Sequence, residues 1–146
     1  MFRKVENQSM LEQFNRIWTE VWHEKGFQLE WSEGVRDRYL IVDQGVYVGC
    51  TEFKSYNEQA AINDFFPFIA HEEVQRHIGR VMEVDKVAIL KEYRGKNVEK
   101  ALSLMTWYAE MHQLKYYVTL MEPMFARALR IAYKVPYQKL GDKLFY

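Results

Sequence analysis

Residues 87–100, VAILKEYRGKNVEK, constrain the fold more than any other part of the chain. The segment opens on an apolar run that is typical of a buried strand. A charged turn with Arg94, Gly95 and Lys96 follows, and apolar residues recur at helical spacing from Val98 onward. Backbone N–H groups and the helix dipole both point into such a turn, so it forms an anion site. The segment therefore predicts a position that suits a diphosphate.

The composition favours one folded domain that spans residues 1–146. Apolar residues make up 49% of the chain, and 4 Trp, 10 Tyr and 9 Phe supply a large core, which excludes a disordered chain. Twenty basic residues balance twenty acidic ones, so we expect no nucleic-acid partner. No apolar run reaches the roughly 20 residues of a membrane span, and the N-terminus lacks the apolar centre of a signal peptide. The single cysteine, Cys50, suits a reducing compartment. We therefore expect a cytoplasmic protein without a membrane span.

The first half of the chain predicts a helix and a β-hairpin. Ser9 and Glu12 form a capping box, helical spacing of apolar residues follows it, and Gly26 is a plausible stop. The apolar stretches 39–42 and 46–53 flank a tight turn, which predicts two antiparallel strands.

The second half predicts alternating strands and helices. The expected elements are a short helix at 71–77, a strand at 82–90, a helix at 97–113, a strand at 116–121, a helix opened by Pro123, and a last strand or hairpin at 137–146. The fold class is therefore α+β, with a mixed sheet and helices packed on it.

This order, with RGK at the turn before the expected helix at 97–113, resembles the GNAT N-acyltransferase superfamily over roughly residues 36–141. The signature of that family is Gln/Arg-x-x-Gly-x-Gly/Ala. Arg94 matches its first position, while Asn97 stands for the middle glycine and Glu99 for the last small residue. Asn tolerates tight backbone, so we expect Asn97 to preserve the turn. Glu99 is expected to face solvent in the first helical turn. The resemblance implies a mostly antiparallel central sheet flanked by helices.

Two further segments are similar to acyl-homoserine-lactone synthases and N-acyl amino acid synthases within that superfamily. Residues 82–87, MEVDKV, follow their Glu-x-x-Arg-Phe strand, with Glu83 on the acidic position and Lys86 in place of the arginine. Residues 128–141 resemble their helix, apolar-Pro-aromatic link and Leu-Gly pair.

The resemblance implies acetyl-CoA or another acyl-CoA as co-substrate. The diphosphate would bind the helix start, largely through backbone N–H groups, with Arg94 or Lys96 adding charge. The residues concerned are Arg94, Gly95, Lys96, Asn97 and Val98. The pantetheine arm would lie along the donor strand as an added strand, at Val87, Ala88 and Ile89. An ordinary solvated turn and a plain core strand are the alternatives.

Two side chains are candidates for catalysis. Tyr133 lies where many enzymes of the family place a tyrosine late in the last helix, which protonates the departing thiolate. Tyr137 competes for this role, and a structural tyrosine is the alternative. Glu83 suits a base for the acceptor amine, acting directly or through water, or a group that holds that amine. In a strand it shares a face with Asp85 while Lys86 points to the other, and a plain polar face remains the alternative reading.

The remaining candidates favour structural roles. The four histidines show no spacing for metal ligands, so we expect no metal. Cys50 is expected to be buried, and Trp18 to belong to the core. Residues 65–69 are expected in the core, and they also fit an acyl pocket or a dimer contact.

These observations favour an N-acyltransferase that moves an acetyl or longer acyl group from acyl-CoA to the amine of a small molecule. A non-catalytic module of the same fold, binding coenzyme A or a protein partner, fits the departures at Asn97 and Glu99. An interaction protein with an accidental RGK turn is the third reading. Exposed sheet edges leave a homodimer open.

Overall fold

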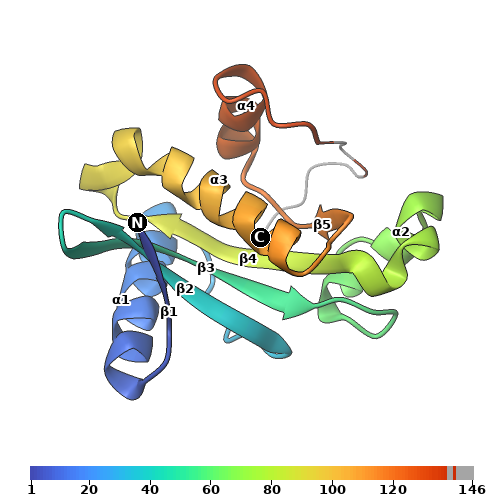
Figure 1. Cartoon of the computed structure of the whole chain (residues 1–146), viewed down its shortest axis with the longest axis horizontal. Coiled ribbons are helices and arrows are strands. Elements are labelled where there is room, and N and C mark those ends of the chain that lie inside the picture. The colour runs from blue at the N-terminus through green and yellow to red at the C-terminus, as the bar shows by residue number, and fades with distance from the viewer. Residues whose placement is uncertain (138–139, 141–146) are drawn as a thin grey trace.

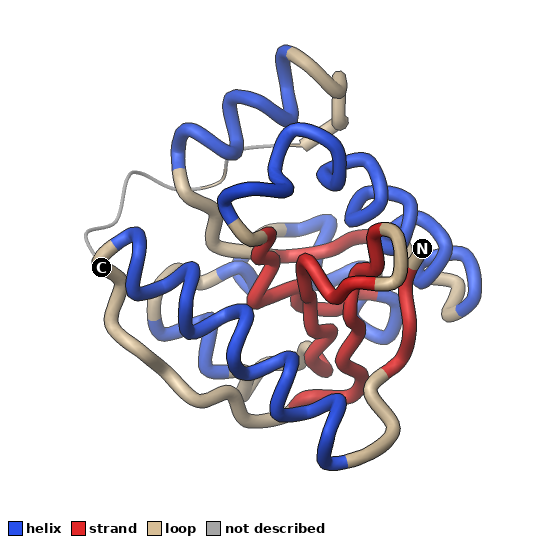
Figure 2. Tube along the Cα trace, turned by 90° about the vertical axis from the view of Figure 1, so that its left-hand side faces the viewer, coloured by secondary structure: helices blue, strands red, loops and turns tan. Residues whose placement is uncertain are grey.

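A central β-sheet with helices on both sides forms the molecule (Figures 1 and 2). The structure is a computed structural model, and it describes residues 1–137 and 140. The strands are β1 (Phe2–Lys4), β2 (Val35–Asp43), β3 (Val46–Ser55), β4 (Val81–Ile89) and β5 (Tyr116–Val118). They pair in chain order, antiparallel from β1 to β4 and parallel between β4 and β5. The expected mixed, mostly antiparallel sheet is confirmed; the short edge strand β1 was not expected.

Within the described residues, four α-helices accompany the sheet. They are α1 (Gln8–Lys25), α2 (Glu72–Arg76), α3 (Arg94–Met111) and α4 (Pro123–Ile131). The expected stop of α1 at Gly26 is confirmed, since this glycine adopts a left-handed φ of 73°. The expected capping box at Ser9 is wrong, because the helix starts before Ser9 and its N-cap is Asn7. The Asn7 side-chain oxygen accepts a hydrogen bond from the Met10 backbone N–H at 2.9 Å.

Each face of the sheet has its own apolar core. On one face α1 buries Phe14, Ile17 and Trp18 against strand residues that include Cys50 and Ala88. The expected core roles of Trp18 and Cys50 are therefore confirmed.

On the other face α3 buries Leu104 and Tyr108 against Tyr39, Phe53 and Val84. The Tyr108 ring stacks on Phe53 with centroids 3.8 Å apart. The sheet is thus sandwiched between α1 and α3, and a side chain on a strand faces one helix or the other.

The β2–β3 connection is the predicted hairpin. Gln44 and Gly45 both have positive φ, at 51° and 79°, which is the backbone that a two-residue type I′ turn needs. Both strands extend beyond the expected apolar stretches because their polar ends continue the ladder.

Several expected boundaries shift in the second half. The helix α3 begins at Arg94 rather than at Asn97, so the RGK residues occupy its first turn, after a 3-10 turn at Lys91–Tyr93. The strand β5 ends at Val118 rather than at residue 121. Most of the expected last strand or hairpin at 137–146 lies outside the described residues.

The strands β4 and β5 pair over only three positions, from Val81 opposite Tyr116 to Glu83 opposite Val118. Beyond them, Thr119 donates its hydroxyl to the Val84 carbonyl at 2.9 Å. β4 then runs on to Ile89, and no described strand pairs with its second edge there. This leaves a row of backbone groups facing the space beside β5.

Candidate functional site

The unpaired edge of β4 leads directly to the start of α3. Only Leu90 and the 3-10 turn at Lys91–Tyr93 separate Ile89 from Arg94. The first backbone N–H groups of a helix have no partner within it, and the helix dipole adds positive charge at that end. An anion at the start of α3 and an extended chain along β4 would therefore be continuous with each other. Of the expected cofactor residues, Val87 packs toward α3 and Ala88 toward α1.

The Arg94 guanidinium forms hydrogen bonds with groups of the protein itself. Its two terminal nitrogens donate to the two Glu24 carboxylate oxygens at 2.6 and 2.7 Å, and its Nε donates to the Ile89 carbonyl at 2.9 Å. The hydrogen bond from Arg94 lowers the pKa of Glu24. Gly95 and Lys96 are exposed, and Val98 is half-buried. Of the two cations expected to serve the diphosphate, Lys96 is the one whose side chain lies in solvent.

Asn97 is fully buried within α3. Its amide nitrogen donates to the Asp43 carboxylate at 3.2 Å and to the Tyr93 carbonyl at 2.8 Å. The expectation that Asn97 preserves a tight turn is wrong, since its backbone is helical and its side chain ties α3 to the β2–β3 hairpin. Its backbone N–H still belongs to the first helical turn. Glu99 is exposed, as expected.

A β-bulge interrupts β4 in front of the unpaired edge. The β3–β4 register shifts between Cys50 and Glu52, and Lys86 adopts a left-handed φ of 53°. The bulge turns Lys86 to the α1 side, where its ammonium lies 4.5 Å from the Trp18 ring centre and 3.7 Å from the Asp85 carboxylate. The expected alternation, with Lys86 facing away from Asp85, is therefore wrong.

Glu83 lies on the α1 side of β4 and is only 6% exposed. Its carboxylate is 3.6 Å from the ammonium of Lys54 on β3, which also lies 3.9 Å from Asp85. Burial raises the pKa of Glu83 to about 7, and the charge of Lys54 opposes part of that rise. A carboxyl group with this pKa is half ionised at neutral pH and suits proton transfer.

Glu52 is a further acidic group that the sequence reading missed. It pairs with Asp85 across the strands, accepts a short hydrogen bond from the Ser32 hydroxyl, and lies 3.4 Å from Arg38. Burial raises its pKa. Glu52 lies within the mostly apolar run VYVGCTEF, which was interpreted only as a strand. Alternation along β3 nevertheless places it on the same face as Cys50 and Lys54.

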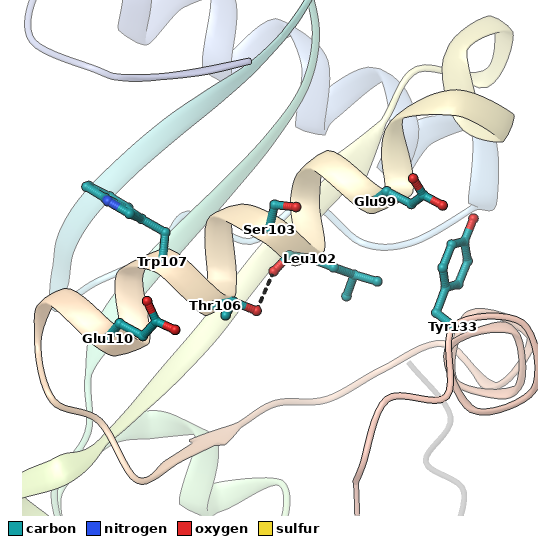
Figure 3. A pocket seen from close by; sticks show the side chains of 7 residues that line it. All are labelled: Glu99, Leu102, Ser103, Thr106, Trp107, Glu110 and Tyr133. Atoms are coloured by element: carbon teal, nitrogen blue, oxygen red, sulfur yellow. Dashed lines mark hydrogen bonds between the residues drawn. The ribbon is translucent and has the colours of Figure 1, made fainter.

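Tyr133 lies beyond the end of α4 rather than late in the helix. It lines an open groove of about 560 Å³ on the outer face of α3, and its hydroxyl points toward Glu99 (Figure 3). Glu83 faces the α1 side of the sheet, so the structure does not bring the two candidate catalytic residues together. The Tyr137 hydroxyl donates to the Ala126 carbonyl at 2.9 Å. The roles of Tyr133 and Tyr137 remain predictions.

Among the described residues, no helix is long and apolar enough to cross a membrane, and no cluster of three potential metal ligands occurs. Within the segment 65–69, Phe68 is buried in a separate core with Tyr56 and Val81, whereas Phe65 is 43% exposed.

Solved structures with a similar arrangement include N-acyltransferases. The chain aligns with FeeM, an N-acyl amino acid synthase from uncultured soil microbes, at a TM-score of 0.72 and 11% identity, over 87% of this chain and 74% of that one. It aligns with the aminoglycoside N-acetyltransferase AAC(6')-Iy in complex with CoA at a TM-score of 0.60 and 13% identity, over 100% and 97% of the two chains.

A third similar structure is an aminoglycoside acetyltransferase from an uncultured soil metagenomic sample, in complex with sisomicin. Its TM-score is 0.65 and its identity 9%, over 100% of this chain and 93% of that one. No family model matches the sequence, and no curated protein matches it significantly. The chain therefore shares the fold of these acyltransferases, and the expected GNAT-like fold is confirmed.

Proposed function

We propose that the protein is an N-acyltransferase that transfers an acetyl or longer acyl group from acyl-CoA to the amine of a small molecule. The observation that carries this proposal is the continuity of three features: the unpaired edge of β4, the start of α3, and the buried Glu83 on the same strand. They supply a place for pantetheine, a place for the diphosphate, and a base whose pKa is about 7. The GNAT fold supports the same reading.

The reaction needs proton transfers both at the acceptor nitrogen and at the leaving sulfur. Glu83 takes a proton from the acceptor ammonium, directly or through a water, and the free amine attacks the thioester carbonyl carbon. Backbone N–H groups on the unpaired edge of β4 are suited to stabilise the oxyanion that develops. The C–N bond forms as the C–S bond breaks, and the attacking nitrogen releases its second proton to water. The departing thiolate takes a proton from an acid, for which Tyr133, in the groove on the outer face of α3, is the sequence-based candidate.

The acceptor would approach from the α1 side, where Glu52, Glu83 and Asp85 alternate with Arg38, Lys54 and Lys86. Two similar structures are aminoglycoside acetyltransferases, which supports an amine acceptor without identifying it. The fold class also supports acyl-CoA as donor, since one of these structures contains CoA.

A second candidate is a non-catalytic module that binds coenzyme A. The pairing of Arg94 with Glu24 favours it, because a cation of the signature is already neutralised by a protein carboxylate. Turnover of acyl-CoA distinguishes the enzyme from the non-catalytic module.

The test combines binding and release of free thiol. Titration with acetyl-CoA, a long-chain acyl-CoA and dephospho-CoA should raise the unfolding temperature, since a ligand of the folded state stabilises it by RT ln(1 + [L]/Kd). Thiol release with a panel of small amines would establish the enzyme, and the donor series would set acyl length. Binding without thiol release would support the module, and absence of any shift at millimolar ligand would reject both.

A further inference from the structure

Arg94 and Glu24 join three elements of the fold at one point. The guanidinium meets the Glu24 carboxylate in a bidentate arrangement, with both contacts between 2.6 and 2.7 Å. Such a fork fixes both planar groups relative to each other. The third bond, from Nε to the Ile89 carbonyl, reaches the last residue of β4. One side chain therefore connects the last turn of α1, the end of β4 and the first residue of α3.

The same contacts leave Arg94 poorly suited to attract a phosphate. Its charge is compensated by Glu24, and three of its N–H groups already have acceptors. A diphosphate at the start of α3 would also meet the Glu24 carboxylate as a like charge. The contribution of Arg94 is therefore geometric: it sets where α3 begins relative to the unpaired edge of β4.

We propose that Glu24 and Arg94 form a positioning clamp that keeps the diphosphate subsite in register with the pantetheine subsite. In this arrangement the backbone N–H groups of α3 bind the phosphates, and Glu24, on another helix, is a positioning residue for the cofactor. The inference rests on the proposed function and assigns the acid its part in donor binding.

The direction in which one substitution changes the affinity for CoA tests the clamp. Replacing Glu24 by Gln removes a negative charge near the phosphates, so simple electrostatics predicts tighter binding of CoA, all the more if Arg94 is freed to contact it. The clamp predicts the opposite, because the fork is lost and the start of α3 shifts. Misplacement by about 1 Å can cost a hundredfold, so we expect Glu24→Gln to weaken CoA binding roughly tenfold.

Glu20→Gln is the matched control. Glu20 lies one turn earlier on α1 and lines the same open groove of about 390 Å³ as Glu24 and Lys91, and it is exposed. It carries the same charge, whereas the ion pair of Arg94 is with Glu24. We expect this control to bind CoA as tightly as the wild type or slightly more tightly.

Two more variants separate positioning from charge. Arg94→Lys keeps the charge and loses the fork, so it should bind CoA as weakly as Arg94→Gln. The double variant Glu24→Gln/Arg94→Gln should be no weaker than either single variant, because both remove the same clamp. Calorimetric titration with CoA gives each Kd, and circular dichroism at the same temperature gives the folded fraction.

The outcomes distinguish this inference from the proposed function. Tighter binding by Glu24→Gln, or wild-type affinity in Arg94→Lys, would overturn the clamp while the CoA site stands. A folded wild type that does not bind CoA would overturn the proposed function and the clamp together. Weaker CoA binding by Glu24→Gln, together with wild-type CoA affinity in Glu20→Gln, would establish the clamp.

Discussion

The Glu83 carboxylate lies 3.6 Å from the Lys54 ammonium across the β3–β4 ladder, and both side chains are largely buried. An isolated ion pair of this kind would lower the pKa of the carboxyl group. Burial outweighs the pairing here, and the pKa of Glu83 rises to about 7. The pair thus holds the carboxylate in place while leaving it able to accept a proton at neutral pH.

Replacing Glu83 by Gln should abolish most of the turnover without preventing CoA binding. General-base catalysis contributes roughly 10²- to 10⁴-fold, so we expect kcat to fall by at least about a hundredfold. In the wild type, kcat should decline as the pH falls through about 7, because the base becomes protonated. Thiol release measured between pH 5.5 and 9 checks both statements. A variant that retains wild-type kcat and the same pH profile would remove Glu83 from the mechanism.

The same group makes the stability depend on pH. The folded pKa of about 7 lies above the usual glutamate pKa of 4.5, so the folded state binds the proton more tightly than the unfolded state does. The free energy of unfolding should therefore fall as the pH rises from about 4.5 to about 7. After a discount for solvent screening we expect a loss of roughly 1 to 2 kcal/mol.

Urea denaturation of the wild type and of Glu83→Gln at pH 5 and pH 7.5 measures this loss. The variant should lack the part of the pH dependence that Glu83 contributes. Parallel curves for the two proteins would contradict the raised pKa.

Restoring the glycine of the family signature at Asn97 should destabilise the protein. Asn97→Gly removes two hydrogen bonds of a buried side chain, leaves Asp43 with one partner fewer, and puts a flexible residue into a helix. We expect a loss of about 2 kcal/mol in unfolding free energy. Ser103→Gly, at an exposed position of the same helix, is the control and should cost only about 0.5 to 1 kcal/mol. Equal losses in the two variants would mean that the contacts of Asn97 contribute nothing.

The sequence predicted the order of the main elements because their signals are local. Apolar runs, the tight turn before Val46 and the stop at Gly26 each depend on neighbouring residues only. The three residues of β1 carry too little pattern to stand out, and they form a strand because β2 offers an edge to pair with.

The site was harder to predict because its key contacts are long-range. Glu24 and Arg94 are 70 residues apart, and Asn97 and Asp43 are 54 apart. A signature residue such as Arg94 carries no sign in the sequence that another helix will neutralise it. The bulge at Lys86 likewise depends on the fit between β3 and β4, so simple alternation assigned that residue to the wrong face.

Removing the Tyr108 hydroxyl group should lower the free energy of unfolding substantially. This hydroxyl donates to the Asp37 carboxylate at 2.6 Å, and Lys4 lies 3.0 Å from the same carboxylate. Burial would raise the pKa of Asp37, but the hydrogen bonds from Tyr108 and Lys4 outweigh it and lower that pKa. Tyr108→Phe should therefore cost about 1.5 to 3 kcal/mol at pH 7, as for a hydrogen bond to a charged group.

The cost of Tyr108→Phe should shrink in acid. A lowered folded pKa stabilises the protein above the unfolded pKa of Asp37, and that stability disappears as the pH falls through the folded value. Denaturation at pH 7 and pH 3 measures the difference. Tyr137→Phe is the control, since its exposed hydroxyl donates only to a backbone carbonyl, and it should change stability by less than about 0.5 kcal/mol. If the loss of unfolding free energy in Tyr108→Phe did not change with pH, the hydroxyl group would not be what lowers the pKa of Asp37.

Gly49 determines how closely β3 approaches β4. A Cβ atom at this position would lie 2.8 Å from the Ala88 carbonyl oxygen, which is backbone and cannot turn aside. Gly49→Ala should therefore push β4 away, cost about 1 to 3 kcal/mol in unfolding free energy, and weaken CoA binding because Ile89 moves with the strand. Gly79→Ala is the control, since nothing lies within 4 Å of its added Cβ. Urea denaturation and CoA titration of both variants provide the test, and unchanged CoA affinity in a destabilised Gly49→Ala would show that the β4 edge does not position the donor.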